Sequence, residues 1–80
     1  MTRAEFIPYV HSFYATGGVY PMGATVAQVV KATKIHRREC KEQGKRVEYD
    51  SVDRERVRDI LIERFGLKFP PPDLDTTLLA

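Results

Sequence analysis

Basic side chains are concentrated in one short part of this chain, between residues 31 and 46. This segment holds seven of the 13 Lys and Arg residues but only two of the 11 Asp and Glu residues. Its net charge is therefore +5, whereas the rest of the 80-residue chain sums to −3. A concentrated positive stripe on a nearly neutral protein is typical of a phosphate-binding surface. The alternative is a solvated helix face, because Lys and Arg on any soluble protein face water.

We expect eight residues of this region to contact nucleic acid. Arg forms paired hydrogen bonds with guanine O6 and N7, and both Lys and Arg hold phosphate. The principal contacts should be Arg37, Arg38 and Lys41. The full predicted set is Lys31, Lys34, His36, Arg37, Arg38, Lys41, Lys45 and Arg46.

Metal and catalytic chemistry find less support in the sequence. Cys40 is the only cysteine, which excludes an internal disulfide and a cysteine-rich zinc site. His36 lies four residues before Cys40, so the two can share a helix face, but two ligands do not make a metal site and no third is evident. The two histidines are far apart in the sequence, and there is no Gly-rich phosphate loop, nucleophile elbow or pair of carboxylates in a catalytic motif. We therefore predict no metal, no cofactor and no enzymatic activity.

Apolar spacing and capping residues predict a mainly α domain of four short helices. We expect them over residues 2–16, 25–33, 36–43 and 51–65, with capping-box spacing at Thr2 and Thr25 and terminating glycines at Gly44 and Gly66. Pro8 should either start the first helix or kink it. The alternating segment 45–49 and the pair Val19–Tyr20 predict one or two short β-strands. One domain should cover residues 1–68, followed by an extended, Pro-rich acidic tail over residues 69–80.

The core of this domain should be built from the apolar faces of the four helices and the 45–49 strand. The predicted core residues are Phe6, Val10, Phe13, Val26, Val29, Val30, Ile35, Cys40, Val47, Val57, Ile60, Leu61 and Phe65.

A tight connection at residues 33–35 would make residues 25–43 a helix-turn-helix. Burial of Ile35 would pin the turn and direct the neighbouring arginines outwards. The stretches "IHRRECKEQG", "KRVEYD" and "SVDRERVRDIL" resemble the excisionase and MerR-like winged helix-turn-helix group, which includes some phage terminase small subunits, over about residues 25–62. This chain has Lys34 at the position of that group's turn glycine. Residues 45–49 match one of the two wing strands, so the wing is either absent or degenerate, with Val19 and Tyr20 supplying the other strand.

The resemblance implies a small DNA-binding regulator of the phage or mobile-element kind, which reads double-stranded DNA with a basic recognition helix. Such a module should act as a homodimer, with either the first or the last helix at the dimer face. The sequence shows neither a signal peptide nor an apolar run long enough to span a bilayer, so we expect a cytoplasmic protein with no membrane partner. The alternative function is a protein-binding modulator or inhibitor that docks on a larger machine such as RNA polymerase, because four tyrosines and many arginines are typical of interface hot spots.

Overall fold

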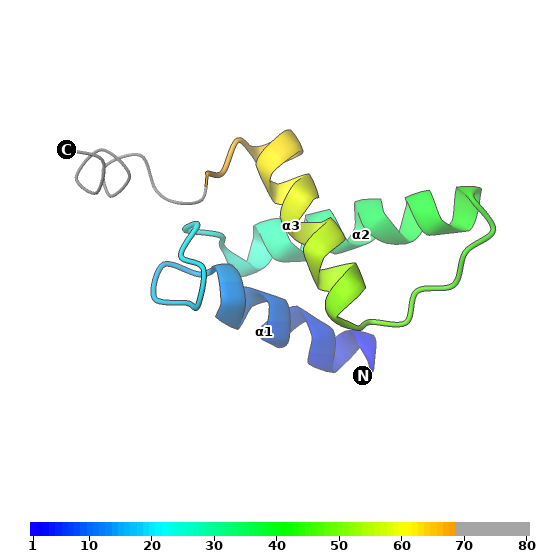
Figure 1. Cartoon of the computed structure of the whole chain (residues 1–80), viewed down its shortest axis with the longest axis horizontal. Coiled ribbons are helices and arrows are strands. Elements are labelled where there is room, and N and C mark those ends of the chain that lie inside the picture. The colour runs from blue at the N-terminus through cyan, green and yellow to red at the C-terminus, as the bar shows by residue number, and fades with distance from the viewer. Residues whose placement is uncertain (69–80) are drawn as a thin grey trace.

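The chain folds into three helices in the computed structural model, which describes residues 1–68 (Figure 1). They are α1 (Arg3–Tyr14), α2 (Val26–Glu42) and α3 (Ser51–Phe65). The long helix α2 packs against both α1 and α3, and α3 crosses it in Figure 1. The fold is therefore mainly α, as predicted, with α2 as the element that the other two helices share.

Each helix begins with a capping box that satisfies its first backbone amides. Thr2 caps α1 with Glu5, and Thr25 caps α2 with Gln28, as the sequence predicts. α3 has the same motif, with Asp50 as the cap and Asp53 as its partner three residues later. These caps fix where the helices start. α1 begins before Pro8 and continues through it as one helix.

The prediction of separate helices over residues 25–33 and 36–43 is wrong. Both belong to α2, which is continuous from Val26 to Glu42. The "TKI" stretch contains neither glycine nor proline, the hydroxyl of Thr33 donates a hydrogen bond to the Val29 carbonyl 2.8 Å away, and Ile35 packs against the core. The helix ends at Glu42. Gly44, two residues further on, adopts a φ of 69° that suits glycine, and the amide of Lys45 donates a hydrogen bond to the Cys40 carbonyl at 2.7 Å. Residues 25–43 therefore contain no turn between two helices.

The prediction of short β-strands is also wrong for the part of the chain that the structure describes. Residues 45–49 form an irregular connection, and Val19 and Tyr20 lie in the exposed loop between α1 and α2. Neither segment finds a partner strand. Tyr49 instead adopts a φ of 55° and packs its ring against Phe6, with ring centroids 5.3 Å apart. No wing is formed among residues 1–68.

The core joins the inner faces of all three helices, and most of the predicted positions belong to it. Among the 13 predicted residues, Phe6, Val10, Val29, Cys40, Val57, Ile60 and Leu61 are buried. Five are only half-buried, namely Phe13, Val30, Ile35, Val47 and Phe65. The prediction that Val26 is buried is wrong, because this residue lies in the first turn of α2 with 51% of its surface exposed.

Several buried residues were not predicted. They are Tyr14, Met22, Ala24, Ala32, Thr33, His36 and Asp53. Met22 and Ala24 are held inwards because their backbone amides donate to the Tyr14 carbonyl, at 3.2 and 2.9 Å. The loop before α2 therefore closes one end of the core.

The predicted tail at residues 69–80 lies outside the described residues. Across residues 1–68, none of the helices combines the length and the apolar character that crossing a bilayer requires.

Candidate functional site

The basic residues of α2 lie together on the side of the helix that faces away from the core. With 3.6 residues per turn, five of them fall within an arc of about 120° that extends roughly 15 Å along the helix axis. We call this set the basic face: Lys31, Lys34, Arg37, Arg38 and Lys41. The buried residues Val29, Ala32, His36 and Cys40 fall on the opposite side. All five basic side chains are exposed.

The basic face continues into an open hollow beside the connection between α2 and α3. This basic hollow, with a volume of about 580 Å³, is lined by Arg37, Arg38, Lys41, Lys45, Val47 and Tyr49. Four of its six lining residues are cations and none is an acid. Arg46 is exposed on the same connection but does not line the hollow. The structure thus brings six of the eight predicted nucleic-acid contacts together on the basic face and in the basic hollow, whereas Arg46 lines a separate cleft.

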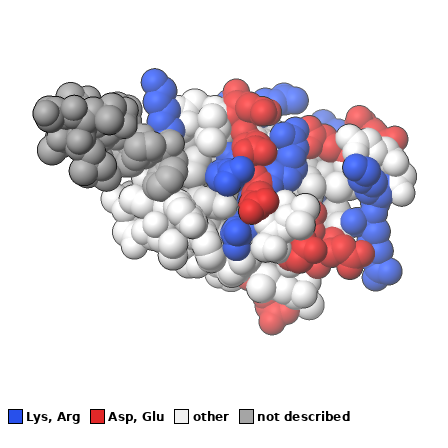
Figure 2. Space-filling model, in the orientation of Figure 1, with Lys and Arg blue, Asp and Glu red and all other residues white. Residues whose placement is uncertain are grey.

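These cations differ in their partners from three of the four arginines of α3. Within residues 1–68, no side chain of the basic face, Lys45 or Arg46 takes part in an ion pair or a hydrogen bond to another side chain. In contrast, Arg54, Arg56 and Arg58 all lie within 4.0 Å of carboxylates. Figure 2 shows blue and red groups interspersed over α3. The charges of α3 therefore neutralise one another, whereas those of the basic face do not.

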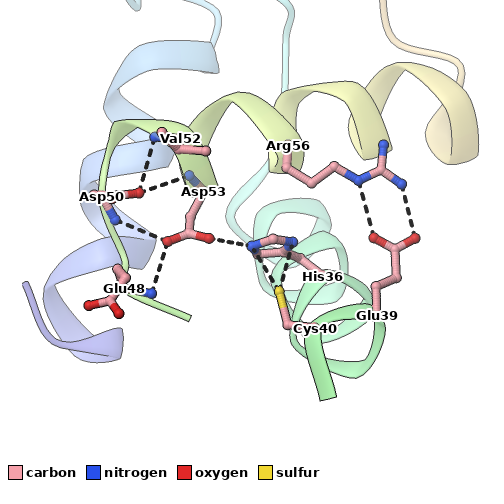
Figure 3. A network of polar contacts seen from close by, with 8 residues as sticks. All are labelled: His36, Glu39, Cys40, Glu48, Asp50, Val52, Asp53 and Arg56. Atoms are coloured by element: carbon pink, nitrogen blue, oxygen red, sulfur yellow. Dashed lines mark hydrogen bonds and ion pairs between the residues drawn. The ribbon is translucent and has the colours of Figure 1, made fainter. Parts of the chain in front are cut away.

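His36 is the one residue of the predicted nucleic-acid contacts that is buried. Its ring is buried between α2 and α3, where Nε2 lies 2.6 Å from Oδ1 of Asp53 (Figure 3). Cys40, one turn further along α2, lies with Sγ 3.7 and 3.8 Å from the two ring nitrogens. We call His36, Cys40 and Asp53 the polar cluster.

Asp53 is held in place by the backbone that precedes α3. Its second oxygen, Oδ2, accepts hydrogen bonds from the amides of Glu48 and Asp50, at 3.1 and 3.2 Å. Burial alone would raise the pKa of Asp53, but the hydrogen bonds from His36 and Asp50 outweigh it and lower this pKa. Asp53 is therefore a carboxylate at neutral pH.

The pKa of the Cys40 thiol shifts in the opposite direction, upwards. Burial raises its pKa, and the negative charge of Asp53 adds to that effect. Cys40 is therefore a neutral thiol at pH 7 and not an activated nucleophile.

An ion pair between α2 and α3 stands beside the polar cluster. Arg56 donates from Nε and Nη2 to the two carboxylate oxygens of Glu39, at 3.1 and 2.9 Å (Figure 3). This paired geometry lowers the pKa of Glu39 through its hydrogen bonds with Arg56. Together, the polar cluster and this pair connect the C-terminal half of α2 to the first half of α3.

The polar cluster is accessible from a cleft of about 400 Å³. All three of its residues line the cleft, together with Glu39, Arg56 and the connection between α2 and α3. Sequence reasoning noticed the spacing of His36 and Cys40 but missed Asp53. The signal that was available is the aspartate three residues after the capping Asp50, because that position of a capping box is fixed next to the helix start.

Comparisons with known proteins add no relative from which a function could be carried over. No protein-family model, no curated protein and no solved structure matches the chain. The resemblance to winged helix-turn-helix proteins therefore stays a prediction, and the function has to be argued from the site itself.

Proposed function

We propose that this protein binds double-stranded nucleic acid, with DNA as the expected target, through the basic face of α2 and the adjoining basic hollow. The observation that carries the proposal is the group of seven exposed cations that find no ion-pair partner within residues 1–68. Five of them share one face of a single helix. Such a surface binds most strongly to a polymer that carries a regular series of phosphates, because each cation can contact one of them.

The shape of α2 supports a duplex as the partner. Its 17 residues span roughly 25 Å, and the major groove of B-DNA is wide enough to admit one α-helix. With α2 in or along the groove, Arg37 and Arg38 lie in the second half of the helix and are expected to reach base edges or phosphates. Lys34 and Lys31, about one and two turns earlier, would contact backbone phosphate.

The basic hollow supplies a place for one phosphate group. It is lined by Arg37, Arg38, Lys41 and Lys45, together with Val47 and Tyr49. Because no carboxylate of residues 1–68 lines the hollow, the lining side chains that carry charge would all attract a phosphate there. Regulation of transcription, as in the phage or mobile-element regulators that the sequence resembles, would follow from such binding at a defined site.

The salt dependence of binding tests this function. We expect the logarithm of the association constant for a duplex to fall linearly with the logarithm of salt concentration, with a slope of about −4 if four or five phosphates are neutralised. Fluorescence anisotropy with a labelled duplex measures this slope. A protein that shows no binding to duplex even at low salt does not have the proposed function.

The alternative partner, an acidic surface on a larger protein machine, is separated from nucleic acid by a capture experiment. The protein is used as bait in a lysate with and without nuclease treatment. If DNA is the partner, nuclease removes the captured material. If an acidic protein is the partner, its capture persists after nuclease treatment, and purified duplex does not compete.

A further inference from the structure

We propose that the polar cluster is a binding site for a divalent transition-metal ion of the zinc type. An imidazole nitrogen, a thiol sulfur and a carboxylate oxygen converge there, and their ligand atoms lie within 4.8 Å of one another. Nitrogen, sulfur and oxygen from His, Cys and Asp are the donors that zinc binds in proteins. This inference does not rest on the proposed nucleic-acid binding, because the polar cluster lies on the buried side of α2, opposite the basic face.

The three ligand atoms, which lie within 4.8 Å of one another, would have to shift by about 1 Å to bind one ion. Metal–ligand bonds of about 2.0 to 2.3 Å in a tetrahedral site separate the ligand atoms by about 3.3 to 3.6 Å. Nε2 of His36 and Sγ of Cys40 are already 3.7 Å apart. Nε2 and Oδ1 of Asp53, now 2.6 Å apart, would have to separate by roughly 0.7 Å to admit the ion between them.

The surroundings of the ligands favour coordination. His36 and Cys40 are one turn apart on α2, so the helix sets their spacing before any metal arrives. The amides of Glu48 and Asp50 hold Oδ2 of Asp53, which leaves Oδ1 directed at the imidazole (Figure 3). Hydrogen bonds of this kind orient metal ligands in proteins and are worth about 10- to 100-fold in affinity.

The cleft leaves a fourth coordination position for water or another small ligand. Its lining contains four acids and three Lys or Arg residues, so the cleft as a whole does not repel a cation. The side chain of Glu48 points away from the polar cluster in Figure 3 and is not a fourth ligand. On binding, the Cys40 thiol releases its proton to solvent and becomes a thiolate ligand. His36 gives up the Nε2 proton that it shares with Asp53, and binds as the neutral imidazole with its remaining proton on Nδ1.

Titration of the reduced full-length protein with Co²⁺ tests this site. We expect one equivalent to produce a near-ultraviolet thiolate-to-cobalt charge-transfer band together with the visible bands of a tetrahedral site, and Zn²⁺ to displace the cobalt. Cys40→Ser should abolish the charge-transfer band, and His36→Gln or Asp53→Asn should weaken binding at least about 100-fold. The matched control is His11→Gln, which removes the other histidine and should leave the titration unchanged.

Two results would overturn the site. One is the absence of a charge-transfer band at stoichiometric cobalt. The other is a band of equal affinity in His36→Gln and Asp53→Asn, which would mean that a single thiol binds the metal. His36→Gln and Asp53→Asn alter a buried pair and can destabilise the fold, so a second measurement is made without them. In thermal unfolding, Zn²⁺ should raise the Tm of the parent protein but not that of Cys40→Ser.

Discussion

Both sides of α2 carry polar and charged residues, but only those on the inner side have side-chain partners within residues 1–68. On the inner side, His36 pairs with Asp53 and Glu39 pairs with Arg56, so both connect α2 to α3. On the outer side, the basic face of five cations finds no partner within residues 1–68. Polar groups that already have partners hold the fold together, and those without partners are available to bind something else.

His36 and the two arginines beside it have different roles, although they belong to one basic segment of the sequence. A position one residue away on a helix points about 100° further round, so His36 faces the core while Arg37 and Arg38 face solvent. Charge counting along the sequence therefore locates the segment correctly but does not separate structural from binding residues. The predictions that follow test each side of α2 in turn.

Replacing Asp53 by alanine should have the largest effect on stability. It leaves His36 buried without its partner and deprives the amides of Glu48 and Asp50 of their acceptor. We expect a loss of about 3 to 5 kcal/mol in the free energy of unfolding, measured by urea denaturation in the presence of a chelator. The control is Glu55→Ala, an exposed acid in the same helix, which should change stability by less than about 0.5 kcal/mol. Equal effects of the two variants would show that the polar cluster is not structural.

Introducing proline at Lys34 tests whether α2 is continuous. In an unbroken helix this change removes a backbone hydrogen bond and clashes with the preceding turn, and we expect a loss of about 3 kcal/mol or more in the free energy of unfolding. Lys34→Ala, which removes the same side chain without affecting the backbone, is the matched control. Stabilities within about 1 kcal/mol of each other would instead indicate a turn at residues 33–35, as a helix-turn-helix requires.

The Glu39–Arg56 pair should contribute less, because both side chains are partly exposed, at 28% and 37%. A double-mutant cycle with Glu39→Ala and Arg56→Ala should give a coupling energy of about 0.5 to 1 kcal/mol in favour of folding. The cycle is measured by urea denaturation at low and high salt. A coupling energy of zero at low salt would mean that this pair does not join α2 to α3.

The sequence predicted the helix starts well because capping is local chemistry. Thr25 and Gln28 are three residues apart and satisfy each other's amides whatever the rest of the chain does. The helix break at residues 33–35 was a wrong prediction for the opposite reason. It rested on apolar spacing and on an assumed tight connection, whereas the local residues contain no helix breaker and Ile35 finds its packing within one long helix.

The partners of the polar residues depended on contacts between distant segments. Asp53 is 17 residues from His36, and only the packing of α3 on α2 shows that they meet. The exposure of Arg37 and Arg38 was predicted correctly, although the reason differs. A continuous helix, not a turn pinned by Ile35, directs them outwards.

The most direct test of the central claim, that the unpartnered face of α2 binds nucleic acid, compares two double variants in duplex binding. Arg37→Ala with Arg38→Ala removes two charges from the basic face. Arg3→Ala with Arg64→Ala removes two exposed arginines from α1 and α3 and serves as the control. We predict that the first variant keeps its helical circular dichroism, binds duplex at least about 10-fold more weakly and loses about two units of the salt slope, while the control binds like the parent. Equal binding by the parent and both variants would contradict the claim.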